Sequence, residues 1–496
     1  MNASAEAAVN ANLAGLVDAD RAGRAEATAF IAAGEAVSYR ALDDGAARFA
    51  GLLAARGVRA GDRVALLLPN IPAFAEAYYG ALRLGAIVVP LNMLLVEPEI
   101  VSRIEHSGAS VLVAEPGRAC GAVPHVDPAE ARLADAHAGV AAVAGSDTAV
   151  LLYTSGTTGH PKAAELSHAG LAWIATQLGA VLDIGPGDVV FGAAPLAHVF
   201  GQSAVLNMTI AAGACAALVP RFDPVAALEL IEREGVSVFL GVPTMCIALL
   251  RASEDTGKAP AMRVAHSGGA PLAVETLRAF VERFDCAVLE GYGLSETAGT
   301  VTSHRAGRPV KLGSVGEPID GTEVRIDGPT GEVGEVLVRG PAVMTGYWHD
   351  EAASREAISP DGWFATGDVG YLDEDGYLFL VDRKKDVILR GGYTVYPREV
   401  EEALYEHPAV REAVAVGVPD ETLGEEVAAL VVLLDGAEVT PADLIAFTRE
   451  RVALYKAPRL IVVAPELPHG PTGKVLRRQI DRAILRELLT NQKTGA

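Results

Sequence analysis

The sequence predicts an α/β fold built on parallel β-sheets with helices on both faces. Short apolar runs of strand length lie at residues 63–69, 86–90 and 111–114, and a stretch with helical periodicity, 74–84, separates the first two. The alternation of strand and helix continues beyond residue 236, which is the rhythm of parallel sheets. At 496 residues the chain exceeds one simple core, so two or more domains are expected.

Residues 1–60 carry helical patterns, and one helix is expected to begin at Tyr39 with Ser38 as its N-cap. The stretch 189–220 contains no charged residue and approaches the length of a membrane span. Glycines, Pro195 and several polar side chains interrupt it, so a strand, a turn and a buried helix explain it better. We therefore expect a chain without a transmembrane segment.

The pattern of predicted helices and strands changes after about Gly313. Shorter, half-exposed strand patterns follow, separated by Gly and Asp turns, and they indicate a small β subdomain at about 313–384. The most charged short run, 382–386, comes next, and a compact pattern of helices and strands follows it. We therefore expect an N-terminal domain at 1–384 and a C-terminal domain at 385–496.

Composition excludes several classes of protein. The formal net charge of −22 argues against a nucleic-acid surface, and more weakly against docking on anionic lipid. The first residues lack the basic and apolar regions of a signal peptide. The four cysteines form no CxxC pair, so we expect a reduced, cytoplasmic protein with buried thiols. The motifs of zinc proteases, serine hydrolases and Rossmann dehydrogenases are absent from the sequence.

A loop of hydroxyl-bearing residues and glycines, 154–162, follows the apolar run 148–153. Such a loop after a strand can turn backbone N–H groups and hydroxyls towards an anion. It is not a Walker A loop, because the second glycine of that pattern would fall on Pro161. Taken alone it is equally a plain surface connection, and it supports only the binding of an anion.

Four other polar loops carry groups that suit a nucleotide. In the loop after strand 286–289, Tyr292 offers a ring for stacking a base and Glu296 offers a hard oxygen for Mg²⁺. Asp368, in a Gly-Asp turn, could hold ribose hydroxyls, and 266–271 is a glycine-rich strand exit. The loop 467–474 carries one lysine. Each is weak alone, since turns with solvated side chains look the same.

Together these motifs resemble the adenylate-forming superfamily of acyl-CoA synthetases, luciferases and peptide-synthetase adenylation domains. The resemblance covers essentially the whole chain, in the family's order. Residues 154–162 are similar to its phosphate-binding signature and 291–297 to its adenine and magnesium motif. Residues 366–368, 382–386 and 471–474 match three further core motifs.

The resemblance implies a large N-terminal domain of two doubly wound sheets plus a small β-barrel, then a small mobile α+β C-terminal domain. It implies Lys474 and His198 as catalytic residues, Glu296 as a catalytic residue and metal ligand, and Lys385 as the hinge. The residues it implies for ATP or AMP binding are Thr154, Ser155, Gly156, Thr157, Thr158, Gly159, Lys162, Gly269, Ala270, Gly291, Tyr292, Ser295, Asp368 and Arg383.

The implied reaction has two steps at one site. A carboxylate attacks the α-phosphate of MgATP, and Lys474, Mg²⁺ and the loop donors offset the repulsion between the two anions. Pyrophosphate leaves, a thiol then attacks the acyl-adenylate, and AMP leaves. Rotation about the hinge would withdraw Lys474, and Gly391 and Gly392 would let the thiol arm approach through a tunnel.

The implied acyl pocket is apolar and built from small residues, with His198 as a gate. Its expected members are His198, Val199, Phe200, Val242, Gly268 and Gly293. Such a pocket favours a medium- to long-chain fatty acid, with a cinnamate- or benzoate-like aryl acid as the alternative. Amino-acid activators need an acidic residue near His198, and none is seen in this sequence. Malonate activators carry an arginine at the position where this chain has Gly291, which argues against a dicarboxylate substrate.

Coenzyme A is the expected acceptor, because the chain ends shortly after Lys474 without a carrier domain. Transfer to a separate carrier protein and assembly into a homodimer are left open. A binding module without catalysis would lack Lys474 or Glu296, and both are present. A luciferase-like oxygenase would share every motif, and a luminescence assay would separate it.

Overall fold

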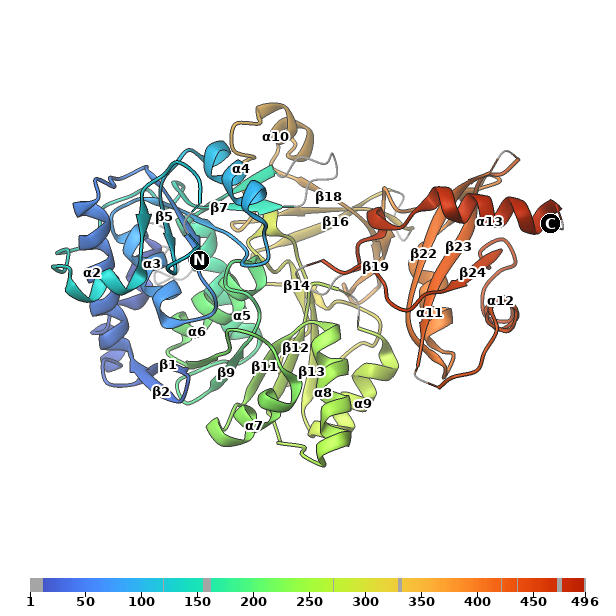
Figure 1. The fold of residues 1–496 in the computed structure, drawn as a ribbon, viewed down its shortest axis with the longest axis horizontal. Coiled ribbons are helices and arrows are strands. Elements are labelled where there is room, and N and C mark those ends of the chain that lie inside the picture. Colours follow the sequence, from blue (N-terminus) through green and yellow to red (C-terminus); the bar gives the residue numbers. More distant parts are fainter. Residues whose placement is uncertain are drawn as a thin grey trace. The chain divides into compact units, whose positions relative to one another are not determined.

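The computed structural model describes residues 12–118, 120–154, 162–270, 272–328, 332–420, 422–434, 436–470 and 475–494. The chain divides into two compact units (Figure 1). The first comprises Met1–Val324 and Val338–Ala365, and the second Arg325–Leu337 and Thr366–Ala496.

The first unit contains a sheet that has nine strands in the described residues. Its central strands are parallel, and antiparallel strands lie at both edges, as the alternating pattern of strand and helix predicts. In spatial order the strands are β15 (Glu317–Pro318), β14 (Thr302–Ser303), β13 (Ala287–Tyr292), β12 (Val264–Ser267), β11 (Val238–Gly241), β9 (Val189–Gly192), β10 (Cys215–Leu218), β1 (Thr28–Ala32) and β2 (Glu35–Ser38).

A second sheet of the first unit has six strands in the described part of the chain, and only its edge strand β8 is antiparallel to its neighbour. The order is β6 (His125–Val126), β5 (Ala109–Ala114), β3 (Arg63–Leu67), β4 (Ile87–Pro90), β7 (Thr148–Thr154) and β8 (Lys162–Ser167). The two doubly wound sheets implied by the family resemblance are therefore confirmed.

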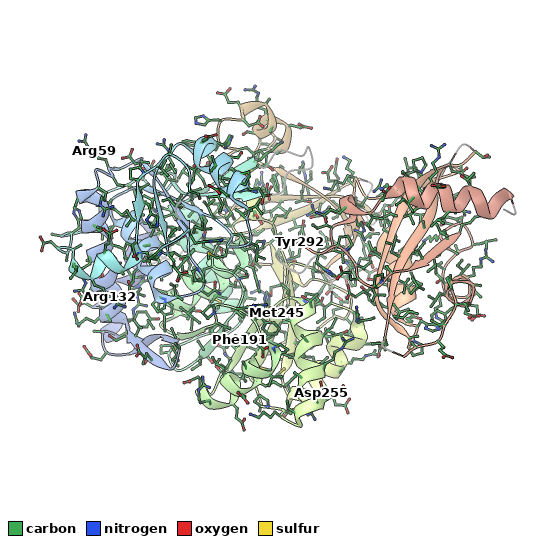
Figure 2. All side chains as sticks on the ribbon, viewed as in Figure 1. Arg59, Arg132, Phe191, Met245, Asp255 and Tyr292 are labelled. Atoms are coloured by element: carbon green, nitrogen blue, oxygen red, sulfur yellow. The ribbon has the colours of Figure 1, made fainter. Side chains whose placement is uncertain are left out.

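Helices cover both faces of the larger sheet. On one face, α7, α8 and α9 pack beside β11–β13, over a core that includes Phe191 and Met245 (Figures 1 and 2). A larger core on the other face joins the two sheets and their helices. The helices of this unit are α2 (Tyr39–Ala55), α3 (Pro72–Arg83), α4 (Glu97–Ser107), α5 (His168–Val181), α6 (Thr209–Ala212), α7 (Pro224–Glu234), α8 (Pro243–Thr256), α9 (Val274–Phe284) and α10 (Glu351–Ala357).

The N-terminal region departs from expectation in one place. Helix α2 begins at Tyr39, and Ser38 Oγ accepts a hydrogen bond from the Ala41 N–H at 3.2 Å, as predicted. The helical patterns of residues 1–60 gave no sign of the β1–β2 hairpin that precedes it. Phe30 is fully buried where β1 pairs with β10, so tertiary pairing overrides the local preference of an alanine-rich segment.

The uncharged stretch 189–220 forms β9, a buried π-helical segment (Gly201–Met208), α6 and β10. The predicted strand, turn and buried helix are confirmed. In the part of the chain that the structure describes, no helix combines the length and the apolar character that a membrane crossing needs.

The second unit contains two sheets. One has the order β16 (Glu323–Asp327), β17 (Gly334–Arg339), β18 (Phe364–Leu372) and β19 (Leu378–Arg383), with β16 and β19 at its edges, where the resemblance implies a small β-barrel. The other consists of β21 (Tyr393–Val395), β20 (Ile388–Arg390), β23 (Gly424–Leu433) and β22 (Val410–Asp420), with β24 (Leu460–Val463) beside β23. The helices are α11 (Pro397–Tyr405), α12 (Pro441–Arg449) and α13 (Arg482–Thr494).

All four cysteines lie in the described residues and are free thiols. Cys215, Cys246 and Cys286 are buried as predicted, whereas Cys120 is half-buried. Burial raises the pKa of Cys215 to about 11 and the pKa values of Cys246 and Cys286 to about 12.

Candidate active site

The predicted adenine-binding residues lie at or just after the carboxyl ends of adjacent parallel strands: Gly269 and Ala270 follow β12, and Gly291 and Tyr292 end β13. Strands β12 and β13 pair through Ser267 and Glu290, so the residues after each strand emerge at the same edge of the sheet. A Cβ atom at Gly268 would lie 3.6 Å from the Gly291 carbonyl oxygen. Gly269, Ala270 and Tyr292 adjoin these positions in the chain. The structure thus brings together the residues proposed to surround adenine.

Close packing, against a histidine ring in one case and against backbone in the other, requires two of the glycines at this edge. A Cβ at Gly291 would lie 2.6 Å from Nε2 of His266, and a Cβ at Gly293 would lie 1.8 Å from the carbonyl oxygen of Gly299. Their presence in the motif therefore has a packing cause that is independent of any ligand. Gly269 adopts φ +81°, a conformation that side chains with a Cβ rarely adopt.

The apolar side chains assigned to the acyl pocket lie around the same glycines. Phe200 approaches a Cβ placed at Gly268 to 3.5 Å, and Val242 approaches one placed at Gly269 to 3.7 Å. Val199 lies 3.6 Å from one placed at Gly299, the residue against which Gly293 packs. His198 is half-buried, and its Nδ1 accepts a hydrogen bond from the Phe200 N–H at 3.3 Å.

His266 is a buried base that sequence reasoning did not single out. Its ring stacks on Phe200 with 6.0 Å between ring centroids, and its Nε2 lies 3.3 Å from Ser303 Oγ. Nδ1 has no hydrogen-bond partner among the described residues. Burial lowers the pKa of His266 to about 4, so the ring is neutral at pH 7. Its only sequence signal is one polar residue in an apolar strand.

Glu296 lies on a 3₁₀ turn, Ser295–Thr297, directly after β13. Its Oε1 accepts a hydrogen bond from Tyr347 Oη at 3.0 Å, and its backbone carbonyl accepts one from the Met344 N–H at 2.8 Å. The Lys162 Nζ lies 5.0 Å from the centroid of the Tyr347 ring. Sequence reasoning missed Tyr347, because an aromatic pair such as Tyr347 and Trp348 reads as ordinary core.

The predicted phosphate loop joins β7 to β8. At its base Thr154 pairs with Lys162, and Thr154 Oγ1 lies 3.5 Å from the Lys162 carbonyl oxygen. The remaining predicted loop residues lie outside the described residues: Ser155, Gly156, Thr157, Thr158 and Gly159. The loop's contacts with phosphate therefore stay a prediction.

The residues around Glu296 fit a magnesium ion. Mg²⁺ in nucleotide enzymes is bound by one or two carboxylates plus phosphate oxygens. Tyr347 occupies Oε1 of Glu296, while Oε2 accepts no hydrogen bond from any residue that the structure describes. One oriented carboxylate with a free oxygen is the donor set that the ion needs from the protein.

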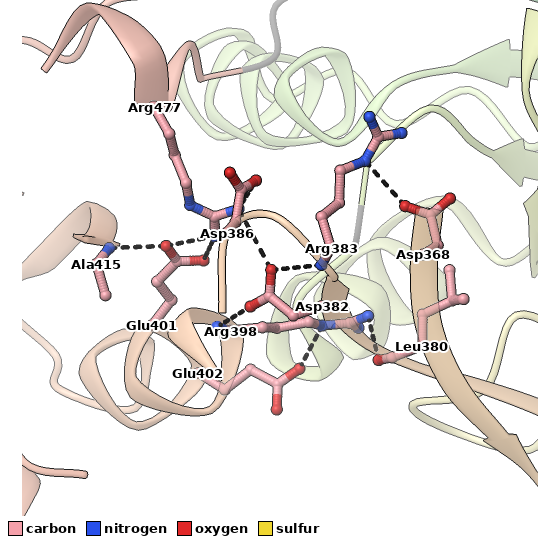
Figure 3. A network of polar contacts seen from close by, with 10 residues as sticks. All are labelled: Asp368, Leu380, Asp382, Arg383, Asp386, Arg398, Glu401, Glu402, Ala415 and Arg477. Carbon is pink, nitrogen blue, oxygen red and sulfur yellow. Dashed lines mark hydrogen bonds and ion pairs between the residues drawn. The ribbon is translucent and has the colours of Figure 1, made fainter. Parts of the chain in front are cut away.

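In the second unit, Asp368 and Arg383 face each other across β18 and β19. Asp368 is buried, and Arg383 Nε lies 2.9 Å from its Oδ1 (Figure 3). The two residues proposed for ribose are thus neighbours. Gly391 and Gly392 both have positive φ, and Lys385 lies inside this unit. Lys474 lies outside the described residues.

The chain matches known proteins over nearly its whole length. Family profiles for the AMP-binding enzyme and its C-terminal domain match residues 17–348 and 399–474. A feruloyl-CoA synthase of Amycolatopsis sp is 38% identical, covering 92% of this chain and 96% of its own. A long-chain-fatty-acid–CoA ligase of Bacillus subtilis is 35% identical, with 90% of each chain covered.

Among solved structures, the o-succinylbenzoate coenzyme A synthetase of Bacillus subtilis, in complex with ATP and magnesium ion, aligns with a TM-score of 0.84. It is 31% identical and covers 94% of this chain and 98% of its own. The chain therefore belongs to the AMP-binding enzymes of the adenylate-forming superfamily.

Proposed function

We propose that the protein is an ATP-dependent carboxylic acid–CoA ligase that acts through an acyl-adenylate. The observation that carries the proposal is the group formed by Glu296, Tyr347 and Lys162, where an oriented carboxylate and an ammonium lie at the base of the phosphate loop. The CoA-forming relatives, which match over nine-tenths of the chain, support the acceptor.

In the first step the acid's carboxylate attacks the α-phosphorus of ATP, and pyrophosphate leaves as the acyl–O–P bond forms. Thr154, Lys162 and the loop between them would bind the departing phosphates, and Glu296 would hold Mg²⁺, which neutralises phosphate charge. Lys474 would stabilise the charge on the transferring group, and His198 would guard the entry of the acid.

In the second step the thiol of CoA attacks the acyl carbon, the C–S bond forms, and AMP leaves with the electron pair of the broken C–O bond. Gly269, Ala270, Gly291 and Tyr292 would contact adenine, and Ser295 the phosphate. Asp368 and Arg383 would bind the ribose hydroxyls, and we assign the hinge to Lys385. Gly391 and Gly392 would admit the pantetheine arm.

The proposed acid is hydrophobic, with a medium- to long-chain fatty acid as the first candidate. The apolar side chains of Phe200 beside Gly268, Val242 beside Gly269 and Val199 beside Gly299 support it. An aryl acid is the second candidate, because the Phe200 ring beside Gly268 suits a flat substrate and a feruloyl-CoA synthase is among the relatives.

The test uses the full-length protein with ATP, Mg²⁺, CoA and one acid at a time: decanoate, palmitate, ferulate, benzoate or malonate. Pyrophosphate release, AMP release, enzyme-bound acyl-adenylate and the mass of the thioester are measured. We expect the highest kcat/KM with decanoate or palmitate and none with malonate. A preference for ferulate would select the aryl candidate. AMP bound as acyl-adenylate without thioester would point to a carrier protein as acceptor. No pyrophosphate release with any acid would contradict the proposed function.

A further inference from the structure

Tyr347 contacts both Glu296 and Lys162, the two charged residues assigned to magnesium and phosphate binding. Its hydroxyl donates to Glu296 Oε1 at 3.0 Å, and the Lys162 ammonium lies 5.0 Å from its ring centroid. Both contacts lie within the first unit. A cation at that distance from a phenol ring is attracted to the electron-rich face.

The backbone around Tyr347 is fastened on two sides. The Glu165 N–H donates to Gly346 O at 2.9 Å and the Trp348 N–H to Ala163 O at 2.8 Å, so the segment 344–348 runs beside β8. On the other side the Met344 N–H donates to the Glu296 carbonyl. The backbone that carries the Tyr347 phenol is therefore tied both to β8, which begins at Lys162, and to the turn that carries Glu296.

The tyrosine contacts two side chains of opposite charge. In the described residues Lys162 and Glu296 form no ion pair with each other, and the ring lies against the ammonium while the hydroxyl binds the carboxylate. A direct pair would neutralise both groups.

We propose that Tyr347 is a positioning residue for the reaction: it orients Glu296 towards the metal ion and holds Lys162 available for phosphate. The inference rests on the proposed function, in which Glu296 binds Mg²⁺ and Lys162 binds ATP. The chemistry recognised is that of a nucleoside triphosphate with a divalent cation.

The test compares Tyr347→Phe and Tyr347→Leu with Tyr39→Phe in the full-length protein. Tyr39 is a matched control, because its hydroxyl donates to Ala214 O at 2.7 Å and the Arg24 guanidinium lies 4.1 Å from its ring centroid. ATP affinity is measured by calorimetry with Mg²⁺ and with a chelator, and pyrophosphate release is measured with the best acid. A melting curve checks that each variant is folded.

We expect Tyr347→Phe to reduce the gain in ATP affinity that Mg²⁺ provides by about tenfold, the effect of one hydrogen bond to a charged group, and to leave metal-free binding unchanged. Tyr347→Leu should also weaken metal-free binding, because Lys162 is then free to pair with Glu296. Tyr39→Phe should behave as wild type. In a Glu296→Gln background, Tyr347→Phe should have no further effect on the Mg²⁺ dependence.

An unchanged Mg²⁺ dependence in Tyr347→Phe would overturn the inference, and so would an equal change in Tyr39→Phe, which would mark a general loss of stability. A wild-type protein whose ATP affinity ignores Mg²⁺ would also overturn it. If no acid supports pyrophosphate release while Mg²⁺-dependent ATP binding persists, the proposed function fails, and the binding ratios alone still decide the role of Tyr347.

Discussion

His168 is a buried residue whose protonation should limit the stability of the protein in acid. Its Nδ1 accepts a hydrogen bond from the Leu13 N–H at 3.1 Å. Burial lowers the pKa of His168 to about 4, from an ordinary value of 6.5. Between these two values the unfolded chain binds a proton that the folded chain does not. The free energy of unfolding therefore falls as the pH decreases from 6.5 towards 4.

We expect His168→Gln to remove part of this pH dependence, because a carboxamide oxygen can accept from Leu13 but does not titrate. Urea unfolding at pH 7.5 and pH 5.0 should show a stability loss about 2 kcal/mol smaller in the variant than in wild type. His266 titrates in both proteins and cancels in the comparison. An identical loss in the two proteins would contradict the assignment to His168.

Single site residues can be predicted from the sequence when they belong to a recognisable local motif. Glu296 and Lys162 are predicted as site residues because each belongs to a motif of recognisable composition. Tyr347 is not, because the role proposed for it depends on a carboxylate 51 residues earlier in the chain, a separation that no local pattern records. His266 escapes for a similar reason, since its partner Ser303 lies 37 residues later on β14, with β13 between the two strands.

In the second unit, the half-buried Arg477 forms ion pairs that join its own segment to two others (Figure 3). Its Nη2 lies 2.7 Å from both carboxylate oxygens of Glu401 on α11. Its Nη1 lies 3.7 Å from Asp382 and 3.5 Å from Asp386, at the two ends of the charged run 382–386. The short turn that begins at Arg477 is thereby tied to α11 and to the proposed hinge segment.

Arg477→Met should destabilise the second unit by about 3 kcal/mol, because it leaves the largely enclosed Glu401 carboxylate without its partner. The double change Arg477→Met with Glu401→Met should recover part of that loss. Arg451→Met breaks an exposed pair with Glu406 and should cost less than about 1 kcal/mol. Calorimetric melting of all four proteins provides the measurement. Equal shifts for Arg477→Met and Arg451→Met would contradict a structural role for the network.

Helices and strands can be predicted from the sequence where the pattern of apolar residues matches their burial. They cannot be predicted where a segment becomes a strand through pairing with a distant strand. Apolar runs predict β3, β4 and β5 because both faces of a parallel strand are buried. Strand β1 could not be predicted, since an alanine-rich segment becomes a strand only by pairing with β10, whose residues lie far along the chain. The π-helical segment is similarly invisible, because local composition does not distinguish it from an α-helix.

At the scale of the whole molecule, one variant should lose the first step of the proposed reaction and keep the second. Lys474→Ala should abolish formation of the acyl-adenylate and spare thioester formation from supplied acyl-AMP, because the lysine is needed only while the α-phosphate is attacked. Lys456→Ala, which removes a cation paired with Glu399, is the matched control and should retain both steps. Pyrophosphate release and thioester formation are measured separately. Equal loss of both steps would rule out the proposed role of Lys474.

The segment 344–348 also covers part of the exposed edge of a sheet, and such edges can cause aggregation. Strand β8 would otherwise expose an edge of hydrogen-bonding groups, and such edges recruit strands from other chains. The backbone of Gly346 and Trp348 occupies part of that edge. The opposite edge, β6, is only two residues long, and the larger sheet ends at β15, which contains Pro318. Loosening the segment around Tyr347 would therefore promote aggregation as well as disturb Glu296.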